Sequence, residues 1–408
     1  MRRTPSSDPL AGATARPSFR AELAQVTRQM RSTLSALLVE GGLDPLDPQA
    51  LVKRWGLNRQ LSWKISKLIQ TADAYAMLQL LPGPQGMDIL LGKAADMGIA
   101  AATRDAARAS LQALDTLIDT HCGDRAVFDI MASACSSGES ALQQQEALRR
   151  QFFQGASAIW GAQTRVNLVT WFVAPSAAGA PTVDMVSLKG WIGFRRLREQ
   201  LSWVISRHMS RHDDGRYMAM PAPEALDPDS DWTLPLMREF SSSPPPDINL
   251  TEEDGRLTVA LAPGPTGLAG QLSCVFGKLH RGLPHARTET DRLSRFICDL
   301  SVPSELVIFD LFVHESLDYA MPPQVALSSL IEPREPGLDR CRLPLHETLA
   351  ELGPASTPPL TLEVPRYADM LARVFERTGW SADEFHGFRL KMAYPPMPAV
   401  LSMSYELR

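Results

Sequence analysis

The hydrophobic pattern of this chain changes once, near Trp160, and this change constrains the fold more than any other feature. Before it, apolar residues recur every three or four positions, which is the period of an amphipathic helix. After it, the apolar runs are short, rich in β-branched and aromatic residues, and separated by turn residues. The pattern predicts an α+β protein with an α-helical N-terminal region and a β-rich C-terminal region.

Residues 18–160 are expected to form the helical domain. Leu23, Met30 and Leu37 share one face of its first helix, which Gly41 terminates. Further helices are expected at residues 48–55, 59–70, 87–97, 101–120, 124–134 and 140–160. Residues 1–17, rich in Ser, Pro, Ala and Gly, are expected to be a disordered tail.

The remainder of the chain is expected to consist of three segments. Residues 161–208 predict a β-hairpin with a connector, and residues 209–247 a Pro- and Ser-rich linker. Residues 248–408 predict a mainly β domain, an antiparallel β-sandwich or barrel with one helix at 366–378. Its expected strands are residues 256–261, 272–279, 294–300, 305–313, 323–330, 360–364, 388–394 and 399–407.

Composition and charge exclude several classes of protein. The chain has 44% hydrophobic and 21% charged residues, as ordinary soluble proteins do, and lacks both a signal-peptide core and an apolar run of membrane-spanning length. Five cysteines without a C-x-x-C pair fit a reducing compartment. We therefore expect a cytoplasmic, bacterial-like protein without membrane contact. Because 41 basic residues face 46 acidic ones, contact with nucleic acid would require a local basic patch.

No residue set in the sequence predicts catalysis or metal binding. His208 and His212 are one helical turn apart, but no third ligand follows. His314-Glu315 and His346-Glu347 both lack the second His of a zinc-protease motif. We expect a protein without enzymatic activity, metal or cofactor, although catalytic residues can converge from distant parts of a chain.

Residues 48–70 carry the one local functional signal. Two short helices are expected here, joined by a turn at Gly56, which tolerates positive φ, and by Asn58, which can cap the second helix. The segment from Asp47 to Gln70 contains five basic residues and one acidic residue, so it carries a charge of +4 in a chain whose net charge is −5. A local patch of this sign attracts phosphates.

This segment resembles the helix-turn-helix of DNA-binding proteins. The resemblance implies that double-stranded DNA is the partner and that the chain is a transcriptional regulator, with a C-terminal domain for sensing or self-association as a homo-oligomer. The implied DNA-binding residues are Lys53, Arg54, Arg59, Gln60, Ser62, Lys64 and Lys67.

Two positions depart from the helix-turn-helix pattern. Val52 stands where the first helix usually has a small residue, and Ser62 stands where an apolar residue usually follows the turn glycine by six positions. Two amphipathic helices of an ordinary core, with a basic solvated side, would give the same sequence. A structural or assembly protein whose basic helices bind a protein partner is a further alternative. Trp63 on the outer side would favour a binding surface, whereas burial against the first helix would favour a core role.

Overall fold

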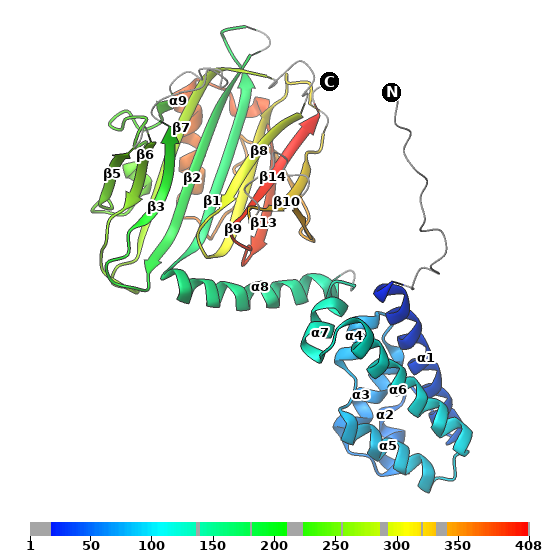
Figure 1. The fold of residues 1–408 in the computed structure, drawn as a ribbon. Helices are drawn as coiled ribbons and strands as arrows, with labels where there is room; N and C mark the ends of the chain where they lie inside the picture. The colour runs from blue at the N-terminus through cyan, green and yellow to red at the C-terminus, as the bar shows by residue number, and fades with distance from the viewer. Residues whose placement is uncertain are drawn as a thin grey trace, which may run out of the picture. The chain divides into compact units, whose positions relative to one another are not determined.

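The computed structural model describes residues 18–135, 139–179, 182–209, 223–253, 256–285, 293–319, 321–331 and 341–406. The chain divides into two compact units, Met1–Gln144 and Gln145–Arg408, and each is described by itself (Figure 1). The expected tail, residues 1–17, lies outside the described residues. Among the described residues, no helix combines the length and apolar character needed to cross a membrane.

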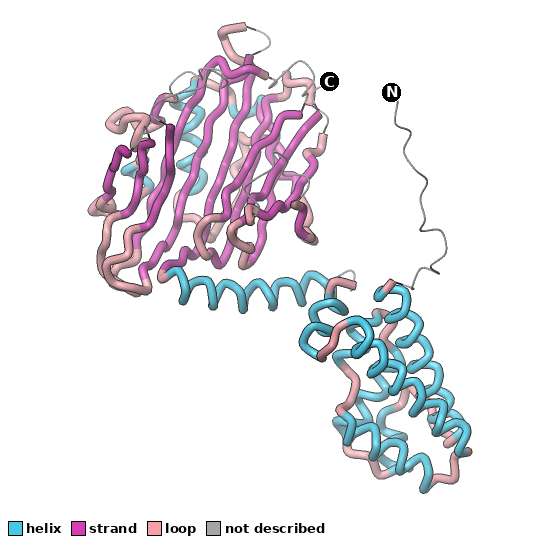
Figure 2. Tube along the Cα trace, in the orientation of Figure 1, coloured by secondary structure: helices cyan, strands magenta, loops and turns pink. Residues whose placement is uncertain are grey.

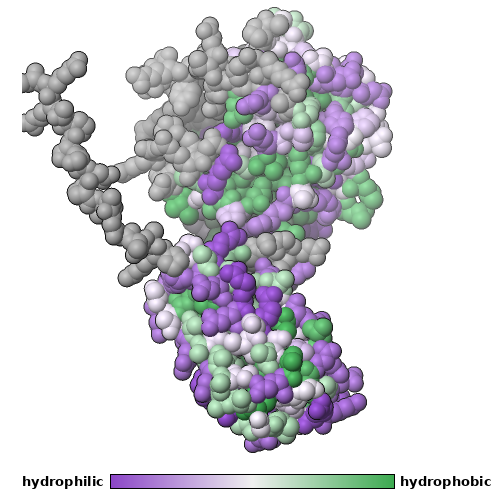
Figure 3. Space-filling view, turned by 90° about the vertical axis from the view of Figure 1, so that its right-hand side faces the viewer, coloured by the Kyte–Doolittle hydropathy of each residue, from purple (hydrophilic) through white to green (hydrophobic). Residues whose placement is uncertain are grey.

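The N-terminal unit is helical, as the periodicity predicts. Its helices are α1 (Phe19–Glu40), α2 (Pro48–Trp55), α3 (Arg59–Gln70), α4 (Ala74–Gln79), α5 (Pro84–Asp96), α6 (Ala101–His121) and α7 (Arg125–Ser133). Side-chain oxygens of Ser18, Asp47, Asn58, Asp73 and Asp124 cap helix N-termini and so define where the helices begin. On the face of this unit that Figure 3 shows, hydrophilic and hydrophobic residues are interspersed.

A single hydrophobic core holds the helical unit together. Leu34 and Leu37 of α1, Trp55 of α2, Ile65 of α3 and Leu114 of α6 are all buried in it. The predicted faces of the helices therefore point inward, and α1 packs along α6.

The second unit is built on a seven-stranded sheet in the order β12-β13-β9-β1-β2-β7-β4. Its strands are β1 (Ala162–Pro175), β2 (Thr182–Arg196), β4 (Glu224–Ala225), β7 (Leu272–Pro284), β9 (Ser304–His314), β12 (Ala350–Pro354) and β13 (Phe385–Ala393). A second sheet has the order β11-β10-β14-β8, with β8 (Leu293–Leu300), β10 (Gln324–Ser329), β11 (Arg342–Leu343) and β14 (Ala399–Glu406). A third has the order β3-β6-β5, with β3 (Trp203–Met209), β5 (Ile248–Glu253) and β6 (Arg256–Leu261).

Among the described residues, two α-helices belong mainly to the β unit. Helix α8 (Glu139–Trp160) precedes β1, and α9 (Tyr367–Thr378) lies between β12 and β13 in the sequence. Phe153 of α8 lies beside Tyr394, with ring centroids 5.4 Å apart. Arg149 of α8 pairs with Glu347 at 2.5 Å, and both side chains are nearly buried.

The two faces of the large sheet are covered by different elements (Figure 2). Alternate residues such as Phe172, Leu188 and Leu279 pack against α9, whose Tyr367 and Met370 are buried there. The opposite face packs against the two smaller sheets, and separate apolar clusters form with each of them. Since side chains alternate along a strand, β1, β2 and β7 pack against other elements on both faces.

A buried polar network fastens α9 to the sheet. Arg389 on β13 donates two hydrogen bonds, of 2.8 and 2.7 Å, to the carboxylate of Asp310 on β9. Tyr367 donates to the same carboxylate and lies 2.8 Å from the hydroxyl of Thr170. Burial and the neighbouring Asp310 carboxylate hold the pKa of Tyr367 above its usual value. Complete pairing makes this buried charge tolerable.

Several expectations for the β region need correction. The large sheet is not a closed barrel, and it is mixed rather than antiparallel, because β1 pairs in parallel with β9. Residues 360–364 form no strand: Leu360 and Leu362 are exposed, and only Val364 of the three alternate apolar residues is buried in the core. The hairpin of residues 161–208 supplies the central strand of the large sheet, β1, and its neighbour β2.

The segment expected to be a linker, residues 209–247, also differs where it is described. Residues 210–222, with His212, lie outside the described residues. From residue 223 onward the segment packs on the β unit, and Leu226, Leu236, Met237 and Phe240 are buried. The apolar residues of this segment follow neither a helical nor a strand period, so the Pro- and Ser-rich composition alone predicted a linker.

Candidate functional site

The basic segment of the helical unit has the predicted local structure. The N–H of Gly56 donates to the carbonyl of Val52 at 3.2 Å and ends α2, and Gly56 adopts a left-handed conformation with φ +67°. Asn58 then accepts the Leu61 N–H at 2.8 Å and begins α3. The turn depends on glycine for its backbone angle rather than for space, because a Cβ at position 56 would meet no atom within 4 Å.

The buried side of α3 is broader than its sequence suggests. Helix α3 contacts α1, α2 and α4, and half of its residues are buried. Ser66 belongs to this side and donates a hydrogen bond of 2.8 Å to the carbonyl of Pro45. Ser62 is also buried completely, so its expected place in the DNA-binding set is wrong. The packing of α3 against several helices makes its buried side wide enough to include serines.

The other predicted residues form what we call the basic face. Its members are Lys53, Arg54, Arg59, Gln60, Lys64 and Lys67. All are exposed except Lys64, which is half-buried. Trp63 lies among them with 48% of its surface exposed, so it is not a core residue. Arg54 donates to the carbonyl of Gly42, which directs its guanidinium toward the turn after α1.

Charge on the basic face is of one sign. Within the described residues, no carboxylate forms an ion pair with its lysines and arginines, whereas Lys93 on α5 pairs with Asp96. Lys67 instead donates to the amide oxygen of Gln70 at 3.4 Å. The face can therefore bind an anion without first breaking an ion pair.

A second candidate site is a cleft in the β unit, with a volume of about 1170 Å³. Its floor is the face of β1, β2 and β7 that is turned away from α9, where cross-strand pairing places side chains in rows. Trp171, Ser187 and Lys278 form one row, and Val169, Lys189 and Phe276 form the next. Lys189 and Lys278 are thus diagonal neighbours on adjacent strands, about 7–8 Å apart at the backbone.

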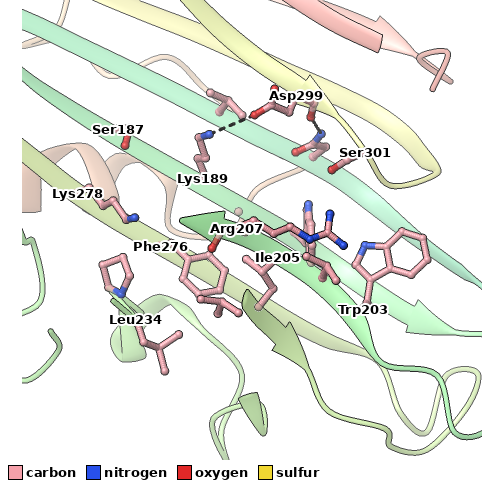
Figure 4. A pocket seen from close by; sticks show the side chains of 18 of the residues that line it. Ser187, Lys189, Trp203, Ile205, Arg207, Leu234, Phe276, Lys278, Asp299 and Ser301 are labelled. Atoms are coloured by element: carbon pink, nitrogen blue, oxygen red, sulfur yellow. Dashed lines mark hydrogen bonds and ion pairs between the residues drawn. The ribbon is translucent and has the colours of Figure 1, made fainter. Parts of the chain in front are cut away.

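The walls of the cleft come from segments far apart in the sequence. Strand β3 contributes Trp203, Ile205 and Arg207, and the segment before the buried Leu236 contributes Leu234 (Figure 4). Trp232, from the same segment, also lines the cleft. Asp299 and Ser301, at the end of β8, lie on the opposite side of Lys189 from Lys278 (Figure 4). Aromatic surface therefore surrounds a small number of charged groups.

Charged groups on the cleft floor interact with one another. Lys189 Nζ lies 3.6 Å from the Asp299 carboxylate, and Asn167 donates to the Asp299 carbonyl at 3.1 Å. Burial, and then the charge of Lys189, lower the pKa of Lys278 to about 8. Burial and Lys278 also lower the pKa of His280, which favours its neutral form at pH 7.

The site residues predicted from the sequence include none of the residues that line the cleft. The available signal was alternation: Ser187, Lys189 and Trp191 on β2, and Phe276, Lys278 and His280 on β7, place polar and aromatic groups on one face. Such positions resemble the solvent side of an ordinary strand until the strand order is known. No group of three or more metal-ligating side chains is present among the described residues.

Comparison with known proteins assigns no family. No protein-family model and no curated protein matches this chain. A solved structure of a proposed protease from Parabacteroides distasonis is similar at 9% identity, over 60% of this chain and 40% of that one, with a TM-score of 0.25. A similarity this low transfers neither fold nor activity.

Proposed function

We propose that this protein binds double-stranded DNA through the basic face of its helical unit and acts as a cytoplasmic transcriptional regulator. The single observation that carries the proposal is that the exposed polar residues and the buried residues of α3 lie on opposite sides of the helix. Arg59, Gln60 and Lys67 are exposed on one side, whereas Ser62, six positions after Gly56, is buried on the other. The helix-turn-helix pattern usually has an apolar residue at that position, so the burial of Ser62 supports the proposed register of α3 even though the residue is a serine.

The exposed groups suit the chemistry of a DNA groove. Arg59 and Gln60 lie in the first turn of α3, and arginine and glutamine side chains can form paired hydrogen bonds with guanine and adenine edges. Lys64 and Lys67 follow on later turns, where ammonium groups can meet phosphates. Lys53 and Arg54, in the last turn of α2, would add flanking phosphate contacts.

The test is titration of the full chain against a labelled mixed-sequence duplex over a series of salt concentrations, read by fluorescence anisotropy. For Lys64→Ala/Lys67→Ala we expect weaker binding to every duplex and a salt slope reduced by roughly two, because each phosphate contact contributes about one unit. Lys93→Ala, which removes a lysine of α5 paired with Asp96, is the matched control and should bind as the wild type does.

Unchanged duplex binding by Lys64→Ala/Lys67→Ala would overturn the proposal. Size-exclusion chromatography with and without duplex addresses the alternative function. Large homogeneous assemblies that are indifferent to DNA would favour a structural protein whose basic helices bind protein.

A further inference from the structure

The cleft of the β unit has properties that DNA binding by the helical unit does not explain. Its lining combines six aromatic residues, Trp160, Trp171, Trp191, Trp203, Trp232 and Phe276, with a few charged groups. Trp160 and Trp232 remain 52% and 40% exposed, although tryptophan is usually well buried. Its volume of about 1170 Å³ is on the scale of small-molecule sites.

The lining carries an excess of positive charge. Among the described lining residues, three cations, Lys189, Arg207 and Lys278, stand against one carboxylate, that of Asp299, which lies near Lys189. Two cations on adjacent strands repel each other, and an anion between them would convert this repulsion into attraction. Burial first, and the charge of Lys189 second, lower the pKa of Lys278, so the cleft disfavours the charged form of this side chain.

We propose that this cleft binds a small organic anion with an aromatic body. Its acidic group lies between Lys189 and Lys278, and its ring system lies against Phe276 and Trp203. Ser187, the cross-strand neighbour of Lys278, is placed to donate a further hydrogen bond to the anionic oxygens. The site is independent of the basic face, since all its residues belong to the β unit.

A small ligand fits these observations better than a single-stranded nucleic acid. Strand-binding grooves carry cations along a track that follows many phosphates. Here Lys189 and Lys278 are neighbours at one place on the floor, and Lys278 is half-buried. One desolvated anionic group, rather than a row of them, matches this arrangement.

The experiment uses 1-anilinonaphthalene-8-sulfonate as the probe and its uncharged counterpart, N-phenyl-1-naphthylamine, as the comparison. Calorimetry with the full chain should show one sulfonate per chain, with energy transfer from tryptophan to the probe. Lys278→Met should weaken sulfonate binding about tenfold or more, because a charge-assisted contact is lost. It should leave binding of the uncharged probe unchanged. Lys391→Met, which removes a β13 lysine paired with Glu363 outside the cleft, is the control and should have no effect.

A second measurement does not depend on the folding of a variant. Because the pKa of Lys278 is lowered to about 8, an anion bound near that pH should favour the charged form, and binding should take up protons. Acetic anhydride labelling of the wild type at that pH should show Lys278 and Lys189 protected by the sulfonate, with Lys391 unprotected.

Equal sulfonate affinity in wild type and Lys278→Met would overturn the proposal, as would equal affinity of wild type for the two probes. Labelling that is unchanged by the sulfonate would overturn it too. Displacement of the probe by a short oligothymidylate, with protection of the same lysines, would replace a small anion by a nucleic acid as the occupant.

Discussion

The basic face of α3 and the floor of the cleft both present cations, but the chain builds them differently. The residues of the basic face lie within a short stretch of sequence on two helices, and most are exposed. The cleft takes its residues from β1, β2, β3, β7 and the end of β8, which meet only because of the strand order. A charge on the first surface keeps its hydration, whereas Lys278 in the cleft loses part of it. Exposure and enclosure therefore make the same residue type suitable for different partners.

The largest expected effect is the loss of stability when the cation of a buried ion pair in the β unit is removed. Arg389→Met leaves the Asp310 carboxylate buried without its cation, and we expect a loss of about 3–5 kcal/mol in the free energy of unfolding. Arg373→Met removes an exposed ion pair with Glu239, and about 0–1 kcal/mol should be lost. Urea unfolding followed by tryptophan fluorescence measures both. Equal losses would show that burial does not distinguish the two pairs.

An intermediate effect is expected from the pH dependence of Lys278. The folded-state pKa of about 8 lies below the unfolded value of about 10.4, so the folded chain binds fewer protons between these values. Lys278 therefore lowers the free energy of unfolding below pH 8, and this destabilisation disappears as the pH rises toward 10.4. We expect Lys278→Met to be about 1–2 kcal/mol more stable than wild type at pH 7, with a smaller difference at pH 10.

The measurement is urea unfolding of both proteins across this pH range. Lys67→Met is the matched control, since it removes a lysine from the exposed basic face. A constant difference between wild type and Lys278→Met from pH 7 to 10 would contradict the assigned environment of Lys278.

The smallest effect concerns the turn that supports the basic face. Asn58→Ala removes the side-chain oxygen that accepts the Leu61 N–H, and about 1 kcal/mol of stability should be lost. Asn58→Ser keeps an acceptor and should restore most of it. Urea unfolding monitored by circular dichroism at 222 nm compares the three proteins. If serine behaves like alanine, capping does not define the start of α3.

Much of the helical unit could be predicted because its information is local. The spacing of Leu23, Met30 and Leu37 specifies one face of α1, and Asp47-Pro48 specifies the start of α2. Ser62 could not be placed in the same way, because its burial depends on how α3 packs against other helices, which the local pattern does not specify.

The β unit could be predicted only as a set of strands. Residues 305–313 identify most of β9, but nothing local indicates that β9 pairs in parallel with β1. Without that strand order, Lys189 and Lys278 are two separate polar residues instead of neighbours on a cleft floor. The register of distant strands determines the site, and a single sequence does not display it.

The parallel pairing of β1 with β9 has a consequence for how the protein is made. Thr164 pairs with Ser304, so a nascent chain completes the β1–β2 hairpin long before the ribosome has added its partner. Until then the backbone groups along one edge of β1 have no strand partner, and Val166, Leu168 and Phe172 lack the β9 and α9 residues of their core cluster. Contacts this distant in sequence form slowly, so the emerging chain passes through an aggregation-prone interval that chaperones could shield.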